Sequence, residues 1–263
     1  MLESGRSMSL LKAKQITVRF GGVHALKNLE LDVNAGVIHG LIGPNGSGKT
    51  TFINVVTGFN RPASGSIAFL GHDITGLKPD QVTRLGIART FQNIRLFKTM
   101  TVLENVTVGH HCRGTSGLLK STFRPPSFYA EEKEVRKEGE ELLEFLGLWK
   151  RREDLAGDLP YGQQRLLELA RALASKPRLL LIDEPAAGMN EQETKWLIEI
   201  LLRIHQQGYT MLIIEHDMKL IMNLSQYITV LDFGEKVAEG LPQEIQHNPR
   251  VIQAYLGTEM GPG

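Results

Sequence analysis

Short apolar runs alternate with helix-like periodic segments along most of the chain. The apolar runs lie at 38–43, 179–183, 211–216 and 227–236. Helical spacing of apolar residues occurs at 49–57, 163–175, 191–206 and 217–224. Strands that alternate with helices in this way form a parallel sheet that the helices cover. The pattern therefore predicts an α/β protein with a largely parallel sheet.

Two parts of the chain depart from this alternation. Residues 10–35 alternate apolar and polar positions around Phe20 and predict antiparallel strands. Over residues 90–158 the strand signal disappears, and residues 131–147 have the spacing of an amphipathic helix. Residues 110–132 are rich in Gly, Ser, Thr and Pro and predict a long loop or short broken helices. We interpret this middle part as a mostly helical subdomain inserted into the core.

Composition narrows the classes of function. With 263 residues, 41% of them hydrophobic, the chain can form one large core or a core with an insertion. The formal net charge is only +1, so no overall charge favours nucleic acid as a partner. Cys112 is the only cysteine, which excludes an internal disulfide and a cysteine-based zinc site. The longest apolar runs fall far short of the roughly 18 residues of a membrane-spanning helix.

The segment GPNGSGKT, residues 43–50, follows a predicted strand and opens a predicted helix. This is the context of a phosphate-binding loop, in which glycines let consecutive backbone N–H groups face a phosphate. Lys49 is expected to neutralise the β- and γ-phosphates, and Thr50 to place its hydroxyl on Mg²⁺. The alternative is an ordinary glycine turn before a helix. The nucleotide-binding candidates here are Gly43, Asn45, Gly46, Ser47, Gly48, Lys49, Thr50 and Thr51.

Two adjacent carboxylates follow the apolar run at 179–183. A buried strand delivers Asp183 and Glu184 to the carboxyl edge of the sheet, where open α/β folds place their ligands. Asp183 can hold Mg²⁺ directly or through water, and Glu184 can accept a proton from an attacking water. Alone, such a pair would most often be a solvated turn. The phosphate loop favours the metal and catalytic interpretation.

The helix predicted at 163–175 has an unusual beginning, because it follows a Pro-Tyr-Gly turn. Its apolar stripe includes Leu166 and Leu173, and Arg165 is expected to point away from that stripe. The free N–H groups at such a helix start attract an anion. No nearby residue in the sequence supplies one.

Together these segments resemble the nucleotide-binding subunit of an ATP-binding-cassette (ABC) transporter, over residues 10–256. The motifs stand in the family's order: Phe20 at the position that stacks on adenine, GPNGSGKT, Gln92 in RTFQNIRLF, the signature LPYGQQR at 159–165, Asp183-Glu184, AGMN at 187–190, and His216 in IIEHDM. The resemblance implies a P-loop NTPase of the ABC ATPase fold. Such a fold has a RecA-like mixed-sheet core, an antiparallel β subdomain and an inserted helical subdomain.

The resemblance implies a role for each motif residue. Glu184 would activate water, Gln92 would contact Mg²⁺ or that water, and His216 would bond the γ-phosphate and orient Glu184. Thr50, Gln92 and Asp183 would form the metal set. Single histidines are usually structural, and a lone aromatic such as Phe20 is packing about half the time. The signature residues that would meet the γ-phosphate of a second subunit's ATP are Tyr161, Gly162 and Gln163.

The signature departs from the family's commonest form, Leu-Ser-Gly-Gly-Gln. Pro160 and Tyr161 replace Ser and Gly, so a serine hydroxyl is absent and Pro160 offers no N–H. Asn190 stands where Asp is frequent. We expect these changes to weaken the composite site. The tyrosine in YGQQR, with EPAAGMN, RTFQNIRLF and the tail GLPQEIQHNPRVIQAYLG, resembles the ATPase subunits of branched-chain amino acid importers, in which Pro160 is less usual than a small residue.

This resemblance implies partners, place and cargo. We expect ATP and Mg²⁺ as cofactors, a second ATPase subunit in a homo- or heterodimer, and two membrane-spanning permease subunits. A periplasmic or extracellular substrate-binding protein would take part indirectly. The chain itself is expected to be peripheral at the cytoplasmic face of the inner or plasma membrane. Residues 92–100 are expected either to dock the permease or to pack internally. Urea, amides or other amino acids are alternative cargoes, and a nucleic-acid or translation ATPase and a small-molecule kinase are rival functions.

The same resemblance implies how the chain is divided. We expect a tail at 1–9, the N-terminal part of the ATP-binding core with its antiparallel β subdomain at 10–90, the helical (signature) subdomain at 91–165, the C-terminal part of the core at 166–257 and a tail at 258–263.

Overall fold

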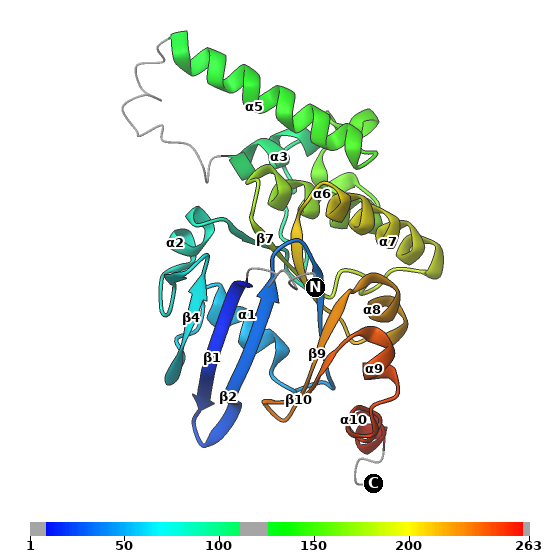
Figure 1. Cartoon of the computed structure of the whole chain (residues 1–263). Coiled ribbons are helices and arrows are strands. Elements are labelled where there is room, and N and C mark those ends of the chain that lie inside the picture. Colours follow the sequence, from blue (N-terminus) through cyan, green and yellow to red (C-terminus); the bar gives the residue numbers. More distant parts are fainter. Residues whose placement is uncertain (1–8, 111–125, 260–263) are drawn as a thin grey trace, which may run out of the picture.

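The computed structural model describes residues 9–110 and 126–259. Cys112, most of the loop expected at 110–132 and the outer parts of both expected tails lie outside these residues. The strands are β1 Ser9–Phe20, β2 Val23–Asn34, β3 Ile38–Ile42, β4 Ser64–Phe69, β5 His72–Asp73, β6 Ile87–Arg89, β7 Leu179–Asp183, β8 Thr210–Ile214, β9 Tyr227–Asp232 and β10 Glu235–Gly240. They form two sheets, one central and one beside it (Figure 1).

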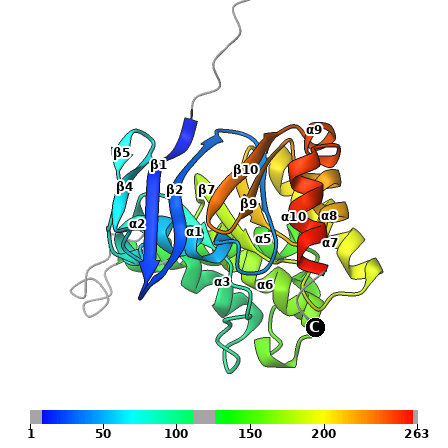
Figure 2. The ribbon, with the colours of Figure 1, turned by 90° about the horizontal axis from the view of Figure 1, so that it is seen from below.

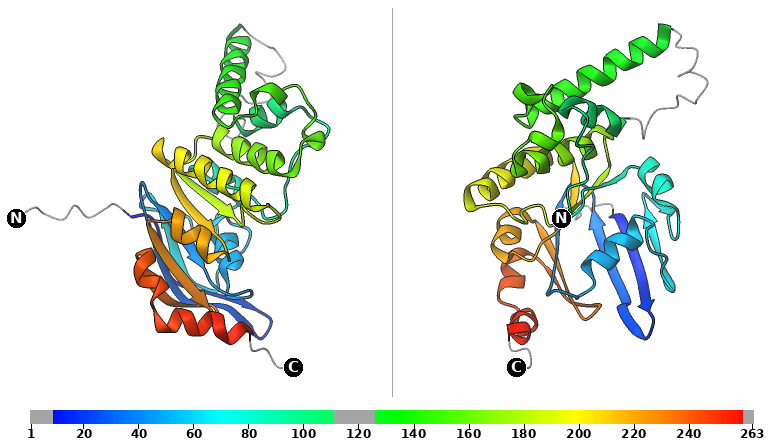
Figure 3. Two further views of the ribbon diagram at one scale, coloured as in Figure 1. Left: turned by 90° about the vertical axis from the view of Figure 1, so that its right-hand side faces the viewer. Right: turned by 180° about the vertical axis from the view of Figure 1, so that it is seen from behind.

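The helices follow the chain in this order: α1 Lys49–Val56, α2 Pro79–Arg84, α3 Val102–His110, α5 Pro126–Phe145, α6 Tyr161–Ala174, α7 Glu191–Gln206, α8 Met218–Leu224, α9 Pro242–Gln246 and α10 Pro249–Glu259. Two short 3₁₀ helices, η1 Trp149–Arg151 and η2 Ala156–Asp158, lie between α5 and α6. Helices α3 and α5 lie at one end of the molecule, and α10 and the β1–β2 hairpin lie at the other (Figures 1 and 3).

The central sheet has the order β10-β9-β3-β8-β7-β6. All its neighbouring strands are parallel except β10, which pairs antiparallel with β9 at the edge. Every residue of β3, β7 and β8 is buried, because helices or the second sheet cover both faces. The predicted α/β class and mixed sheet are confirmed. The apolar run at 227–236 divides into two strands at Phe233 and Gly234, both with positive φ.

The second sheet is antiparallel, with the order β2-β1-β4-β5. This confirms the antiparallel strands expected for residues 10–35. Seen from below, β1, β2 and β4 lie on one side and α8, α9 and α10 on the other, with β9 and β10 between them (Figure 2). The strand β2 passes beside the phosphate loop, since Gly48 lies against the backbone oxygen of Ala25.

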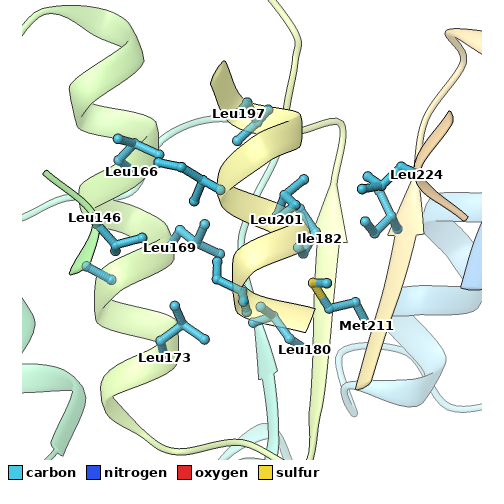
Figure 4. Close-up of a cluster of buried hydrophobic side chains, with 14 of the residues drawn as sticks. Leu146, Leu166, Leu169, Leu173, Leu180, Ile182, Leu197, Leu201, Met211 and Leu224 are labelled. Carbon is cyan, nitrogen blue, oxygen red and sulfur yellow. The ribbon is translucent and has the colours of Figure 1, made fainter. Parts of the chain in front are cut away.

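Helix α6 connects the helical end of the molecule to the central sheet. Its buried stripe includes Leu166, Leu169 and Leu173, as the spacing predicts. These side chains pack in one cluster with residues of α7 and β7, such as Leu201 and Leu180 (Figure 4). Each fully buried leucine side chain stabilises the fold by roughly 1.5–3 kcal/mol relative to an exposed one. Helix α6 is therefore packed against α7 and the sheet that carries Asp183.

Candidate nucleotide-binding and catalytic site

The phosphate loop, residues 43–50, joins β3 to α1 as predicted. Two of its glycines occupy places that no other residue fits. A Cβ on Gly43 would lie 2.1 Å from the oxygen of Leu231, and one on Gly48 would lie 2.6 Å from the oxygen of Ala25. Both also have positive φ, 149° and 103°. The loop is therefore curled tightly between β2 and β9.

The Lys49 side chain turns back into this loop. Its Nζ donates to the carbonyl oxygens of Gly43 at 2.7 Å and Pro44 at 2.8 Å, and to Ser47 Oγ at 3.3 Å. Burial lowers the pKa of Lys49, while the charges of Glu184 and Asp183 act in the opposite direction. A cation thus stands in the loop within electrostatic range of both carboxylates.

Asp183 ends β7 and is buried, with Arg89 as its partner. Arg89 Nη2 lies 2.9 Å from Asp183 Oδ2, and Nη1 donates to Asn54 Oδ1 at 2.7 Å. The sequence analysis did not identify Arg89. In the sequence it stands out only as an arginine at the end of a short apolar segment. That segment forms β6, which pairs with β7. A buried cation at this place holds the Asp183 carboxylate in a fixed orientation.

Glu184 stands directly beyond β7 with a φ of 46°, a conformation that is uncommon for residues with side chains. Its backbone N–H donates to the oxygen of Ile214, which continues the β7–β8 pairing by one residue. Gln92 Nε2 donates to Glu184 Oε2 at 2.7 Å. His216 Nδ1 lies 4.0 Å from Glu184 Oε1, and its side chain is 60% exposed. The structure thus brings together the three residues predicted as catalytic.

His216 also has a buried neighbour that the sequence did not single out. Glu215 Oε2 lies 3.6 Å from His216 Nδ1 and accepts the His216 backbone N–H, while Glu215 Oε1 accepts the N–H of Ala186. Burial raises the pKa of Glu215, and these hydrogen bonds and His216 oppose the shift. Glu215 therefore ties the segment after Glu184 to the segment that carries His216.

The residues of the expected metal set share one cavity. Thr50, Gln92 and Asp183 all line a space of about 340 Å³, together with Asn54 and Arg89. Hydroxyl, amide and carboxylate oxygens suit Mg²⁺, which binds through one or two carboxylates and completes its ligands with phosphates and water. Within residues 9–110 and 126–259, no cluster of three or more His, Cys, Asp or Glu could hold a metal alone. The donors therefore fit a magnesium ion that arrives with a nucleotide.

The signature residues open α6 at Tyr161, two residues before the start of the helix predicted at 163–175. Pro160 caps the helix without a side-chain hydrogen bond. The Tyr161 hydroxyl donates to the oxygen of Ala187 at 3.0 Å, so the start of α6 contacts the loop before α7. Asn190 caps α7, because its Oδ1 accepts the N–H groups of Gln192 and Glu193. Asn190 therefore caps α7 without the aspartate that is frequent at this position.

Two further residues lie as follows. Phe20 ends β1 and is 54% exposed, so its ring has a free face; its stacking role stays a prediction. Arg165 was expected to point away from the apolar stripe of α6; its burial was not expected. It is buried and faces Glu168 and the backbone of Phe91 and Gln92. An ion pair and backbone carbonyls provide the polar partners that make its burial possible.

Comparisons with known proteins identify the class. A family model described as ABC transporter matches residues 26–187, and one described as branched-chain amino acid ATP-binding cassette transporter matches residues 235–260. The chain belongs to the ABC transporter family of ATP-binding cassettes and is an ATPase. In the part of the chain that the structure describes, no helix has the length and apolar character to cross a membrane.

The similar proteins have more specific names. The high-affinity branched-chain amino acid transport ATP-binding protein BraF of Pseudomonas aeruginosa is 42% identical, over 95% of this chain and 99% of its own. LivG of Escherichia coli K12, with the same descriptive name, is also 42% identical over the same shares. The ADP conformation of MJ1267, an ATP-binding cassette of an ABC transporter, has a TM-score of 0.83 at 37% identity and covers 95% of this chain and 99% of its own.

Proposed function

We propose that this chain is the ATPase subunit that drives an importer of branched-chain amino acids. The observation that carries the ATPase mechanism is the hydrogen bond between Gln92 and Glu184 beside the phosphate loop. The cargo rests on the likeness to BraF and LivG and on the match of the C-terminal residues 235–260. The cargo itself does not touch this subunit.

The residues of the site divide the chemistry among them. Lys49 and the loop N–H groups hold the β- and γ-phosphates, and Thr50, Asp183 and Gln92 hold Mg²⁺, which neutralises developing phosphate charge. Glu184 accepts the proton of the attacking water. His216, on the far side of Glu184, bonds the γ-phosphate and restrains the carboxylate. Phe20 stacks on the adenine with its exposed ring.

The signature completes the site of a second subunit. The start of α6 presents backbone N–H groups of the kind that bind an anion, so we assign them to the γ-phosphate bound by a partner's loop. Tyr161, Gly162 and Gln163 then act across a head-to-tail dimer. A solved relative with a TM-score of 0.74 at 25% identity is described as a dimeric ATP-binding cassette bound to ADP and Pi. The partner is a second copy or a sister subunit.

A groove beside residues 92–100 is the surface that we assign to the membrane subunits. A cavity of about 530 Å³ lies next to residues 92–100 and is lined mainly by apolar side chains, among them Val82, Ile87, Leu96 and Phe97. We assign it to two membrane-spanning permease subunits, which places the chain peripherally at the cytoplasmic face. A substrate-binding protein outside the membrane would act through the permeases and not on this chain.

The replacement of Glu184 by Gln tests the mechanism. Gln keeps the size of the side chain but cannot accept the proton, so turnover should fall by about 10²–10⁴ while ATP still binds. Binding of a fluorescent ATP analogue and phosphate release are measured separately, with Glu191→Gln, an exposed carboxylate in α7, as the matched control. Normal phosphate release by the Glu184 variant contradicts the proposed role.

The cargo needs its own experiment. Purified chain is reconstituted with its permease and binding-protein partners in vesicles, and ATP-driven uptake of labelled leucine is compared with that of urea and a short amide. Preferential uptake of leucine supports the proposal. Preferential uptake of urea or the amide assigns the same ATPase to a different importer.

A further inference from the structure

Two buried, oppositely charged residues of α6 hold the backbone of the loop that carries Gln92. Arg165 and Glu168 lie one turn apart, and the side chains are 5% and 2% exposed, with Nη1 and Oε2 separated by 3.6 Å. Arg165 donates through Nη1 to the oxygen of Phe91 at 2.7 Å and through Nη2 to the oxygen of Gln92. The forked guanidinium thus grips two consecutive peptide groups.

Glu168 holds the same loop through its N–H groups. Its Oε1 accepts from the backbone nitrogens of Phe91 at 3.4 Å and Arg95 at 3.3 Å. Burial raises the pKa of Glu168, and these two hydrogen bonds together with Arg165 oppose the shift. Carbonyls and amides of residues 91–95 therefore meet complementary charges from one helix. The backbone on either side of Gln92 is fixed in orientation.

The same guanidinium also reaches the signature. Arg165 Nη2 donates to the Tyr161 hydroxyl at 3.0 Å, and that hydroxyl donates in turn to the oxygen of Ala187. Gly188, the next residue, lies against the Tyr161 ring, because a Cβ there would be 3.3 Å from it. The start of α6, the loop at 91–95 and the loop at 187–190 are thereby joined through two side chains, Arg165 and Tyr161.

We propose that Arg165, supported by Glu168 and Tyr161, is a positioning residue that aims Gln92 at Glu184. A buried ion pair contributes little to stability compared with well-packed apolar residues, but it imposes direction on the groups that it bonds. A displacement of the signature end of α6 would therefore move the backbone of Gln92 and, through it, the amide that touches Glu184. The inference rests on the proposed roles of Gln92 and Glu184.

Arg165→Lys is the first test, because lysine keeps the charge beside Glu168 but cannot bond two carbonyls and a hydroxyl as a fork. We expect kcat to fall about 10–100-fold, since misplacement of a catalytic group by about 1 Å can have such an effect. The KM for ATP should stay within about twofold, because no nucleotide contact is removed. Tyr227→Phe in β9, outside this network, serves as a control and should keep wild-type rates.

A double-mutant cycle with Gln92→Ala separates positioning from a general structural role. If Arg165 acts through Gln92, adding Arg165→Lys to Gln92→Ala should lower kcat by less than about twofold. An equal loss of kcat in both backgrounds overturns the inference, and so does a rise in KM with kcat unchanged.

A second, smaller substitution tests the inference even if Arg165→Lys prevents folding. Tyr161→Phe removes only the hydroxyl that links Arg165 to Ala187, at a half-exposed position. It should lower kcat in the same direction and lose its effect in the Gln92→Ala background. The cycle measures coupling between Arg165 and Gln92, whereas the Glu184→Gln experiment measures the base. Failure of one is therefore distinguishable from failure of the other.

Discussion

At the scale of single residues, the site depends on charges that are buried together. Asp183 and Arg89 come from neighbouring strands, and Arg165 and Glu168 from one helix. Each pair is almost entirely removed from solvent, so loss of one partner leaves the other buried and uncompensated. The Asp183 carboxylate, which we propose as a metal ligand, thus also has a structural part.

Removal of Arg89 should show how much the buried Asp183 carboxylate destabilises the fold when it has no cation beside it. Arg89→Met leaves the Asp183 carboxylate buried without its cation, and we expect the free energy of unfolding to fall by about 3 kcal/mol. Urea denaturation measures it. In the double variant with Asp183→Asn the charge is gone, so the combined loss should be smaller than the sum of the single losses. An unchanged unfolding midpoint for Arg89→Met would show that the carboxylate is solvated in another way.

Residue-scale prediction from the sequence succeeded where the chemistry is local. The phosphate loop was found because glycines, Lys49 and Thr50 lie within eight positions. Arg89 and the burial of Arg165 were missed, because their partners are set by the folded chain: Asp183 lies 94 residues from Arg89, and Phe91 lies 74 residues from Arg165. Helical periodicity assigns an arginine to the surface and has no means of detecting a buried carboxylate or carbonyl opposite it.

At the scale of elements, the contact between α3 and α6 is unusually close. Gly109 permits it, because a Cβ there would lie 2.2 Å from the oxygen of Arg171 and 2.9 Å from the Cβ of Ala174. Gly139 in α5 makes an easier contact, with the flexible end of Leu103 at 3.2 Å. Strands and long helices were predictable from periodicity. The short distance between α3 and α6 was not, because it depends on which helix packs against Gly109 in the folded chain.

The two glycines form a matched pair for mutation. Gly109→Ala must push α6 away from α3, which we expect to lower the free energy of unfolding by about 1–3 kcal/mol. Gly139→Ala should be neutral or mildly stabilising, because alanine favours a helix by about 1 kcal/mol over glycine and Leu103 can move. Thermal or urea unfolding compares them. Equal effects of both substitutions would contradict the close approach of α3 and α6.

At the scale of the whole molecule, the expected metal cavity and the apolar groove are neighbours. The phosphate loop and Glu184 lie at the carboxyl ends of β3 and β7, and the apolar groove lies next to Gln92 on the helical side. Both surfaces include Arg89, Phe91 and Arg95 in their lining. We therefore expect a partner in the groove to contact the segment that carries Gln92, whose side chain bonds Glu184.

Phe97→Asp tests the groove as a docking surface. Phe97 is about half exposed, so the change should leave the melting temperature unaltered while it weakens binding to detergent-solubilised permease subunits by about 30-fold, or 2 kcal/mol. Leu241→Asp, equally exposed at the start of α9, is the control. Unchanged permease affinity with a lowered melting temperature would instead mean that residues 92–100 pack internally.

The hydrogen bonds from Lys49 to its own loop have a consequence for affinity. They fix the curl of the glycine-rich segment as part of folding, so the conformational entropy of ordering these residues is lost then and not when a nucleotide arrives. On the proposed role of Lys49, we expect a triphosphate to replace these ammonium contacts with contacts to its own oxygens. The affinity of the loop for a triphosphate then depends on how far the attraction between Lys49 and the phosphates exceeds the lost bonds from Lys49 to the loop. Because this attraction is electrostatic, we expect the affinity to fall as ionic strength rises.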